Sequence, residues 1–203
     1  MKIDLDLGHT RLIIREADRA GVLRNQLAYI LATAFWETNR TMQPVVEAYW
    51  LSEAWRKANL RYYPWHGRGF VQLTWQGNYL RAGQELDVDL ITDPDEALKP
   101  EIAARILVCG SMEGWFTGKC VSDYITLRKS DYIGARRVIN GTDKAAEIAA
   151  IAKDYDAALL ASGYGITAPL DHVAPPTPAT PPQRSLWAAL ASLLAGFFGK
   201  DKA

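Results

Sequence analysis

Few residues in this chain can bind a metal ion or form a cross-link. The 203-residue sequence has two cysteines and three histidines. The spacing of Cys109 and Cys120 matches neither the disulfide framework of a small secreted domain nor a zinc pattern. We therefore expect no metal site and expect two small buried hydrophobic cysteines, with a bridge between them left open.

The chain also lacks a net charge and a secretory leader. Its 23 basic and 23 acidic side chains cancel, so no global field favours nucleic acid as a partner. The segment from Met1 to Gly21 has no apolar core and no small-residue cleavage site, so it is not a signal peptide. These absences predict a product made in the cytoplasm, whose export needs another route.

Proline is scarce except near the C-terminus, where six of the ten prolines lie between Pro169 and Pro182. Such a segment stays extended, so residues 169–184 are predicted to be a linker. Residues 185–203 are predicted to form an apolar helix, whose uncharged run of 15 residues is shorter than the roughly 20 that cross a bilayer comfortably. An oligomerising helix, a self-docking helix and a short spanning helix all fit. We favour membrane contact because almost nothing on this helix is polar.

Residues 1–168 are predicted to form one mostly α-helical domain with at most a small β element. Apolar residues recur every three or four positions over most of this segment. The alternation in Phe70–Trp75 instead favours a strand. The expected helices are Thr10–Gly21, a helix capped by Asn25 and ending near Asn39, Val45–Ala58, a helix that starts at Asp93-Pro94, one that starts at Pro100, residues 130–138, and one capped by Thr142 or Asp143 and closed by Gly163.

The helix capped by Asn25 carries an acid at its end. Glu37 shares a face with Ile30 and Ala34, so it points toward the core. Low polarity and the negative end of the helix dipole both raise the pKa of a carboxyl group. Glu37 is therefore predicted to be a neutral general acid. The alternative is a solvent-facing Glu at a frayed helix end.

A second acid is needed to activate water or to stabilise a developing cation. Glu47 and Glu53 are the nearest candidates. Glu47 is preferred because the apolar residues around it, such as Val46 and Trp50, would hold it against apolar surface.

The segment from His66 to Tyr79 has the residue types of a sugar-binding wall. Glycines on both sides of Arg68 let the backbone approach a ligand closely. Gln72 and Thr74 share one face of an extended piece, and amides and hydroxyls on one wall suit the hydroxyl and acetamido groups of a sugar. The alternative is a buried polar hairpin that satisfies its own backbone. The candidate substrate-binding residues here are Tyr49, Arg68, Gln72, Thr74, Asn78 and Tyr79.

Four segments resemble the family 19 glycoside hydrolases, and most closely the chitinase-like endolysins of bacteriophages of Gram-negative bacteria. They are FWETNR (35–40), HGRGFVQLTWQGNY (66–79), DPDEAL (93–98) and RRVING (136–141), and the resemblance covers residues 10–162. It implies a lysozyme-like helical fold of two lobes flanking a groove, and it implies that Asn140, in the last of these segments, is a further substrate-binding residue. It also implies an inverting hydrolase without a cofactor, with Glu37 as general acid and Glu47 as second carboxylate, roughly 6.5–9.5 Å apart.

The sequence therefore predicts an endolysin that hydrolyses β-1,4 glycosidic bonds of peptidoglycan and stays in the host cytoplasm until it is released to the cell wall. A chitinase and a lytic transglycosylase are alternative enzymes. An inactive glycan-binding module is the alternative outside the enzymes, because Trp36, Asn39 and Arg40 replace the family's usual His and Gly-Gly.

Overall fold

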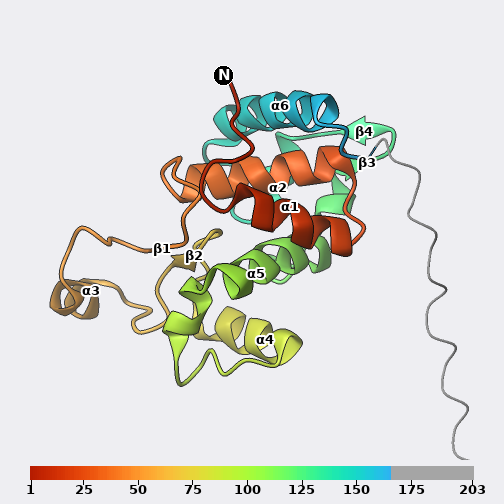
Figure 1. The fold of residues 1–203 in the computed structure, drawn as a ribbon. Coiled ribbons are helices and arrows are strands. Elements are labelled where there is room, and N and C mark those ends of the chain that lie inside the picture. The colour runs from red at the N-terminus through yellow and green to blue at the C-terminus, as the bar shows by residue number, and fades with distance from the viewer. Residues whose placement is uncertain (166–203) are drawn as a thin grey trace, which may run out of the picture. The chain divides into compact units, whose positions relative to one another are not determined.

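The structure is a computed structural model that describes residues 1–165. This part of the chain is mostly α-helical, as predicted, with two small antiparallel sheets of two strands each (Figure 1). The predicted linker and apolar helix, at residues 169–184 and 185–203, lie outside the described residues. The elements in chain order are α1 (Thr10–Arg19), α2 (Arg24–Glu37), β1 (Val45–Val46), α3 (Glu53–Asn59), β2 (Arg68–Gly69), α4 (Gln76–Leu86), η1 (Pro94–Leu98), α5 (Pro100–Glu113), η2 (Val121–Asp123), β3 (Ile125–Thr126), β4 (Lys129–Ser130), η3 (Gly134–Val138) and α6 (Ala145–Ala161), where η denotes a 3-10 helix.

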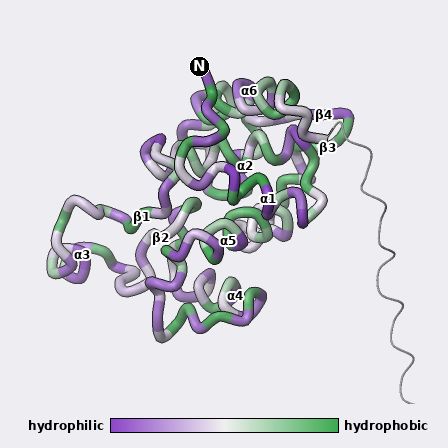
Figure 2. The backbone as a smooth tube through the Cα atoms, viewed as in Figure 1, coloured by the Kyte–Doolittle hydropathy of each residue, from purple (hydrophilic) through white to green (hydrophobic). Residues whose placement is uncertain are grey.

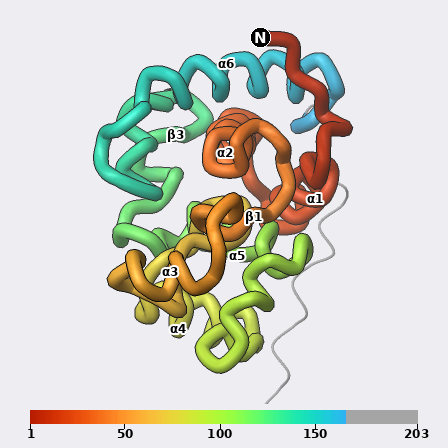
Figure 3. The backbone as a smooth tube through the Cα atoms, turned by 90° about the vertical axis from the view of Figure 1, so that its left-hand side faces the viewer, coloured from red at the N-terminus to blue at the C-terminus, as the bar shows by residue number. Residues whose placement is uncertain are grey.

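Helix α2 is the centre of the core. Ten of its residues are buried, among them Leu27, Ile30 and Leu31. A helix that is apolar on nearly every side must be surrounded by other elements. Viewed nearly along its axis, α2 lies inside a ring formed by α1, α6 and the chain around β3 (Figure 3). Each large aliphatic side chain that is fully buried there stabilises the fold by about 1.5–3 kcal/mol.

Helix α6 covers α2 with one apolar face. Ile148, Ala152, Tyr155 and Leu159 are almost fully buried, and hydrophobic and hydrophilic residues alternate along the helix (Figure 2). Together α1, α2 and α6 form one group, α3 and α4 lie on the other side, and α5 runs between them (Figure 1, Figure 3).

The predicted cap of α2 is wrong. The helix begins at Arg24, after Leu23, whose backbone N–H donates to the Gln26 side chain at 3.1 Å. The Asn25 side chain donates instead to the carbonyl of Thr126 in the β3–β4 hairpin. Asn25 therefore fastens a hairpin to α2, a long-range contact that no local capping rule anticipates.

The predicted helix at Val45–Ala58 is wrong in its first half. The two valines form β1, which pairs with β2. The next backbone N–H, that of Glu47, donates to the carbonyl of Gly67 at 2.7 Å. Ala48 then has a φ of +52°, which an α-helix does not allow. Only α3, after this turn, is helical.

The predicted strand at Phe70–Trp75 is a tight turn. Arg68 and Leu73 exchange two backbone hydrogen bonds, of 3.2 and 2.9 Å. Gln72, between them, has a φ of +55°. The alternation of burial nevertheless persists along the turn, which explains why the sequence reads as a strand.

Three other predicted helices differ from the structure in their caps or in their helix type. Helix α6 is preceded by Lys144 with a φ of +58°, and neither Thr142 nor Asp143 caps it. Its predicted end at Gly163 is confirmed by a φ of +84° and an N–H bond to Leu160 at 3.1 Å. The helices expected to start at Asp93-Pro94 and to cover 130–138 are the short 3-10 helices η1 and η3.

Within residues 1–165, Cys109 and Cys120 are free and half-buried rather than buried. This part of the chain contains no cluster of three or more His, Cys, Asp or Glu side chains that would hold a metal ion. None of the helices described here combines the length and the apolar character that crossing a bilayer requires.

Candidate active site

Two adjoining cavities form a cleft beside the C-terminal end of α2. Their volumes are about 540 and about 420 Å³. Glu37, Glu47 and Gln72 line both cavities, so a polymer lying along the cleft passes both acids. The other residues lining the larger cavity are Tyr62, Val71, Leu73, Thr74, Trp75, Asn78, Phe116, Thr117, Ile139, Asn140 and Gly141.

Glu37 is the last residue of α2, and 19% of its side chain is exposed. Its Oε1 accepts a hydrogen bond from Nη1 of the buried Arg136 at 3.1 Å. Burial raises the pKa of Glu37 above its ordinary value, and the charge of Arg136 opposes part of that rise. The predicted direction of the shift is confirmed, although the arginine that limits it was not predicted.

Two hydroxyl groups lie beneath Glu37 on the same face of α2. Tyr29, Thr33 and Glu37 follow at intervals of four residues. The hydroxyls of Tyr29 and Thr33 are buried and have no hydrogen-bond partner. Burial raises the pKa of Tyr29 to about 12, so this phenol stays neutral. Tyr29 was not predicted as a site residue, although its spacing from Glu37 places both residues on one face of α2. Arg136 is 99 positions from Glu37, and only the fold brings them together.

Glu47 follows β1 and is held by two donors. The Tyr62 hydroxyl donates to its Oε1 at 2.7 Å, and the backbone N–H of Gly67 donates to its Oε2 at 2.9 Å. Burial and the nearby carboxylate raise the pKa of Tyr62 to about 12, so Tyr62 stays a donor. Both oxygens of Glu47 are therefore fixed as acceptors, which suits a carboxylate.

Gly67 makes this arrangement sterically possible. A Cβ atom at this position would lie 2.7 Å from Gln72 Oε1 and 3.2 Å from Glu47 Oε2. The sequence predicts close backbone approach at the glycines, but for a ligand. The structure shows that the approach at Gly67 is to Glu47 and Gln72.

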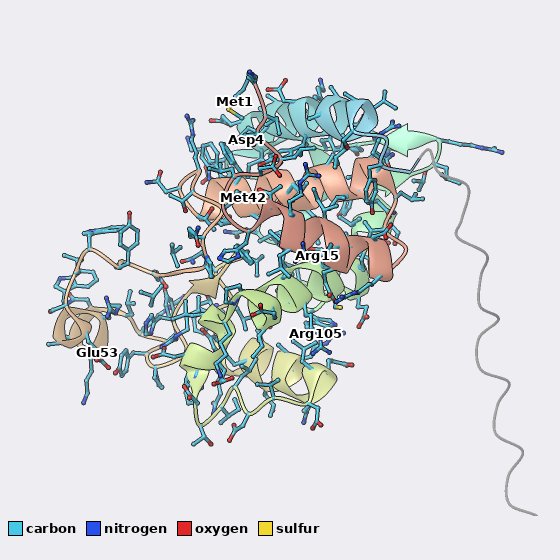
Figure 4. The ribbon with its side chains drawn as sticks, in the orientation of Figure 1. Met1, Asp4, Arg15, Met42, Glu53 and Arg105 are labelled. Carbon is cyan, nitrogen blue, oxygen red and sulfur yellow. The ribbon has the colours of Figure 1, made fainter. Side chains whose placement is uncertain are left out.

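Glu53, the other candidate for the second acid, lies away from the cleft. It is exposed at the start of α3, which lies apart from the helices around α2 (Figure 4). Its carboxylate accepts a hydrogen bond from Tyr63 at 2.8 Å. It lines neither cavity, so the structure brings Glu47 and not Glu53 to Glu37.

The polar wall is partly occupied by its own backbone. Gln72 Nε2 donates to the Val45 carbonyl at 3.0 Å, and the Thr74 hydroxyl donates to the Gln72 carbonyl at 2.7 Å. Asn78 Nδ2 donates to the Thr74 carbonyl at 2.9 Å. All three side chains still line the larger cavity, so their amide and hydroxyl oxygens remain as acceptors for a ligand. Asn140 also lines this cavity, but its Oδ1 already accepts from the Gly141 N–H at 2.8 Å.

Arg68 and Tyr79 do not line the cleft, so the prediction that they contact a ligand is wrong. Both are buried. Arg68 pairs with Asp95 at 2.7 Å and also donates to the Tyr79 hydroxyl at 3.2 Å. Tyr79 in turn donates to the His66 carbonyl at 2.7 Å. These residues hold the cleft wall in place from behind.

Aromatic rings line both cavities. Tyr49 and Trp50, 54% and 71% exposed, line the smaller cavity and pack edge to face. Tyr62 and Trp75 line the larger cavity and pack in the same manner, with ring centres 5.0 Å apart. Exposed rings beside a groove provide flat apolar surfaces for the faces of sugar rings.

Comparison with protein-family models and with curated proteins finds no match to this chain.

Proposed function

We propose that this chain is a glycoside hydrolase that cleaves β-1,4 bonds of bacterial peptidoglycan. The observation that carries the proposal is that two carboxyl groups in different environments line the same cleft. Glu37 has a raised pKa, and Glu47 accepts hydrogen bonds through both oxygens. Pairs of acids with separated environments divide the roles of acid and base in this reaction.

In the proposed mechanism Glu37 protonates the leaving glycosidic oxygen. Glu47 activates water or stabilises the oxocarbenium-like state. Arg136 then lies beside Glu37 when that residue becomes charged, which favours the anion formed by proton transfer. The residues of the chain supply each of these groups, so the mechanism requires no cofactor.

The proposed biological role is host cell lysis by a bacteriophage endolysin. This role is supported by the resemblance of four segments to chitinase-like endolysins and by a cleft whose two cavities are both lined by the acids and by aromatic rings. The protein would act on glycan strands after release from the host cytoplasm to the cell wall.

The decisive experiment is mass spectrometry of the products released from purified peptidoglycan by the wild type and by Glu37→Gln. Reducing-end muramic acid fragments that vanish in the variant support a muramidase with Glu37 as its acid. Loss of a general acid lowers the rate by about 10²–10⁴-fold. Glu53→Gln, outside the cleft, is the matched control and should retain activity.

Other products would assign other reactions. Anhydro-sugar ends, with Glu47→Gln nearly harmless, would make the protein a lytic transglycosylase. Release from chitin oligomers alone would make it a chitinase. Binding without any release of fragments, unchanged by Glu37→Gln, would make it a glycan-binding module and refute the proposal.

A further inference from the structure

An exposed arginine, Arg61, lies over the ring of Trp75, which lines the larger cavity. The guanidinium carbon of Arg61 lies 4.8 Å from the centre of the Trp75 ring. Trp75 lines the larger cavity and is 46% exposed. Within residues 1–165, no carboxylate lies at ion-pair distance from Arg61. Its N–H donors are therefore available to a ligand.

The backbone of Trp75 adopts an unusual conformation and is held by hydrogen bonds on both sides. Its φ is +77°, which is a clear outlier for a bulky residue. Its N–H donates to the Trp65 carbonyl at 2.9 Å, and its carbonyl accepts from Asn78 and Tyr79 at the start of α4. A strained residue that is tied on both sides, with its ring in a cleft, is typical of a binding position.

Ring contacts link Arg61 to the second acid. Trp75 packs against Tyr62 with ring centres 5.0 Å apart, and the Tyr62 hydroxyl donates to Glu47 at 2.7 Å. Arg61 therefore lies two aromatic rings from Glu47. A sugar bound next to the reacting bond and beside Trp75 would bring its substituents close to Arg61.

We propose that Arg61, presented by Trp75, binds a carboxylate carried by muramic acid and thereby distinguishes peptidoglycan from chitin. This inference rests on the proposed function. Chitin is uncharged, whereas every muramic acid carries a lactyl group that is either free or joined to a peptide with carboxylates of its own. The planar fork of an arginine matches a carboxylate in two parallel hydrogen bonds.

The test measures binding by the full-length chain in a Glu37→Gln background, so that the ligand is not consumed. Calorimetry compares soluble glycan strands with stem peptides, the same strands after amidase treatment, and hexameric N-acetylglucosamine. Arg61→Gln should weaken binding of charged strands about two- to fivefold, the size of an exposed ion pair, and should make binding less dependent on salt. Binding of the neutral hexamer should not change.

Arg15→Gln is the matched control. Arg15 is an exposed arginine on α1 (Figure 4), and within residues 1–165 it does not lie over an aromatic ring as Arg61 does. This substitution removes the same charge and should leave all three affinities unchanged.

The two strand preparations identify the source of the carboxylate. An effect of Arg61→Gln on intact strands alone assigns the stem-peptide carboxylates. An effect only after amidase treatment assigns the lactyl carboxylate, which is an amide in intact strands, and an effect on both preparations means that Arg61 binds either carboxylate. Equal weakening for the neutral hexamer would mean that Arg61 only supports the Trp75 ring, and no weakening for any ligand would exclude a role in binding. Either result overturns the inference, as does failure of all three ligands to bind. The proposed function is judged separately, from the products released by the wild type.

Discussion

Glu37 is subject to two opposing influences, because burial raises its pKa and Arg136 lowers it. Arg136→Gln should therefore raise the pKa of Glu37 further. A general acid is active while protonated, so the alkaline limb of the pH profile of kcat/KM should move to higher pH. Arg136→Lys keeps a positive charge and should shift the limb less.

Arg137→Gln is the control for this prediction, because the neighbouring Arg137 is exposed and forms no ion pair within residues 1–165. Melting temperatures measured alongside would separate a change in pKa from a loss of fold. An alkaline limb that stays in place in Arg136→Gln would contradict the assignment of Glu37 as the acid or of Arg136 as its partner.

The same raised pKa predicts how stability depends on pH. The folded state holds the Glu37 proton more tightly than the unfolded chain, whose reference value is 4.5. The stability contributed by this proton is fully present below that value and is lost as the pH rises through the folded pKa. Glutamine does not titrate, so the stability of Glu37→Gln relative to the wild type should rise as the pH increases above 4.5. Thermal unfolding across this range measures the gap, and a constant gap would contradict a raised pKa.

The β1–β2 pairing positions the second acid, and Gly67 is its tightest point. Gly67→Ala places a methyl group against Gln72 and the Glu47 carboxylate. Misplacement of a catalytic group by about 1 Å can cost about 10²-fold, so we expect kcat to fall by about 10- to 100-fold while the fold persists. Kinetics and circular dichroism together check this.

Gly77→Ala is the paired control, since a Cβ at Gly77 in the first turn of α4 meets nothing within 4 Å. Alanine is also the better helix former, so this variant should be at least as stable as the wild type. Equal losses of activity in the two variants would show that the effect at Gly67 is not steric.

The sequence predicts well the elements whose conformation is set by neighbouring residues in the chain. Helices α2, α5 and α6 carry long apolar patterns, and Pro100 marks the start of α5. Residues 45–52 and 70–75 were misjudged because their conformation depends on partners that are distant in the chain. The N–H of Glu47 is satisfied by Gly67, and the positive φ of Gln72 belongs to a turn closed by Arg68 and Leu73.

The residues of the candidate site also fall into two groups, those that the sequence indicates and those that only tertiary contacts identify. Composition and spacing pointed to Glu37, Glu47 and Gln72, which line both cavities, and to Thr74 and Asn78, which line the larger one. Asn140, which also lines the larger cavity, came from the family resemblance. Arg68 and Tyr79 were misplaced because sequence does not show which polar residues are consumed by internal pairing. Arg136 and Tyr62 were missed because only tertiary contacts bring them to the acids.

The whole chain combines a compact unit, Met1–Thr167, with a C-terminal segment that the sequence predicts to seek membranes. A truncation to residues 1–168 contains every candidate site residue and should cleave glycan strands as the full chain does. The full chain alone should float with anionic lipid vesicles. Equal flotation of the two proteins would refute membrane contact through the tail.

The hydrogen bonds between Glu47 and Gly67 run in both directions, from one backbone N–H to a carbonyl and from the other to a carboxylate. These bonds join the two ends of the long loop that contains α3. The ends of this loop therefore stay together whatever sequence lies between them. Closing a longer or shorter loop over fixed ends costs little. We therefore expect that residues 48–61 could be shortened or replaced to change which polymer the proposed enzyme binds, while Tyr62 and Gly67 still hold Glu47 in place.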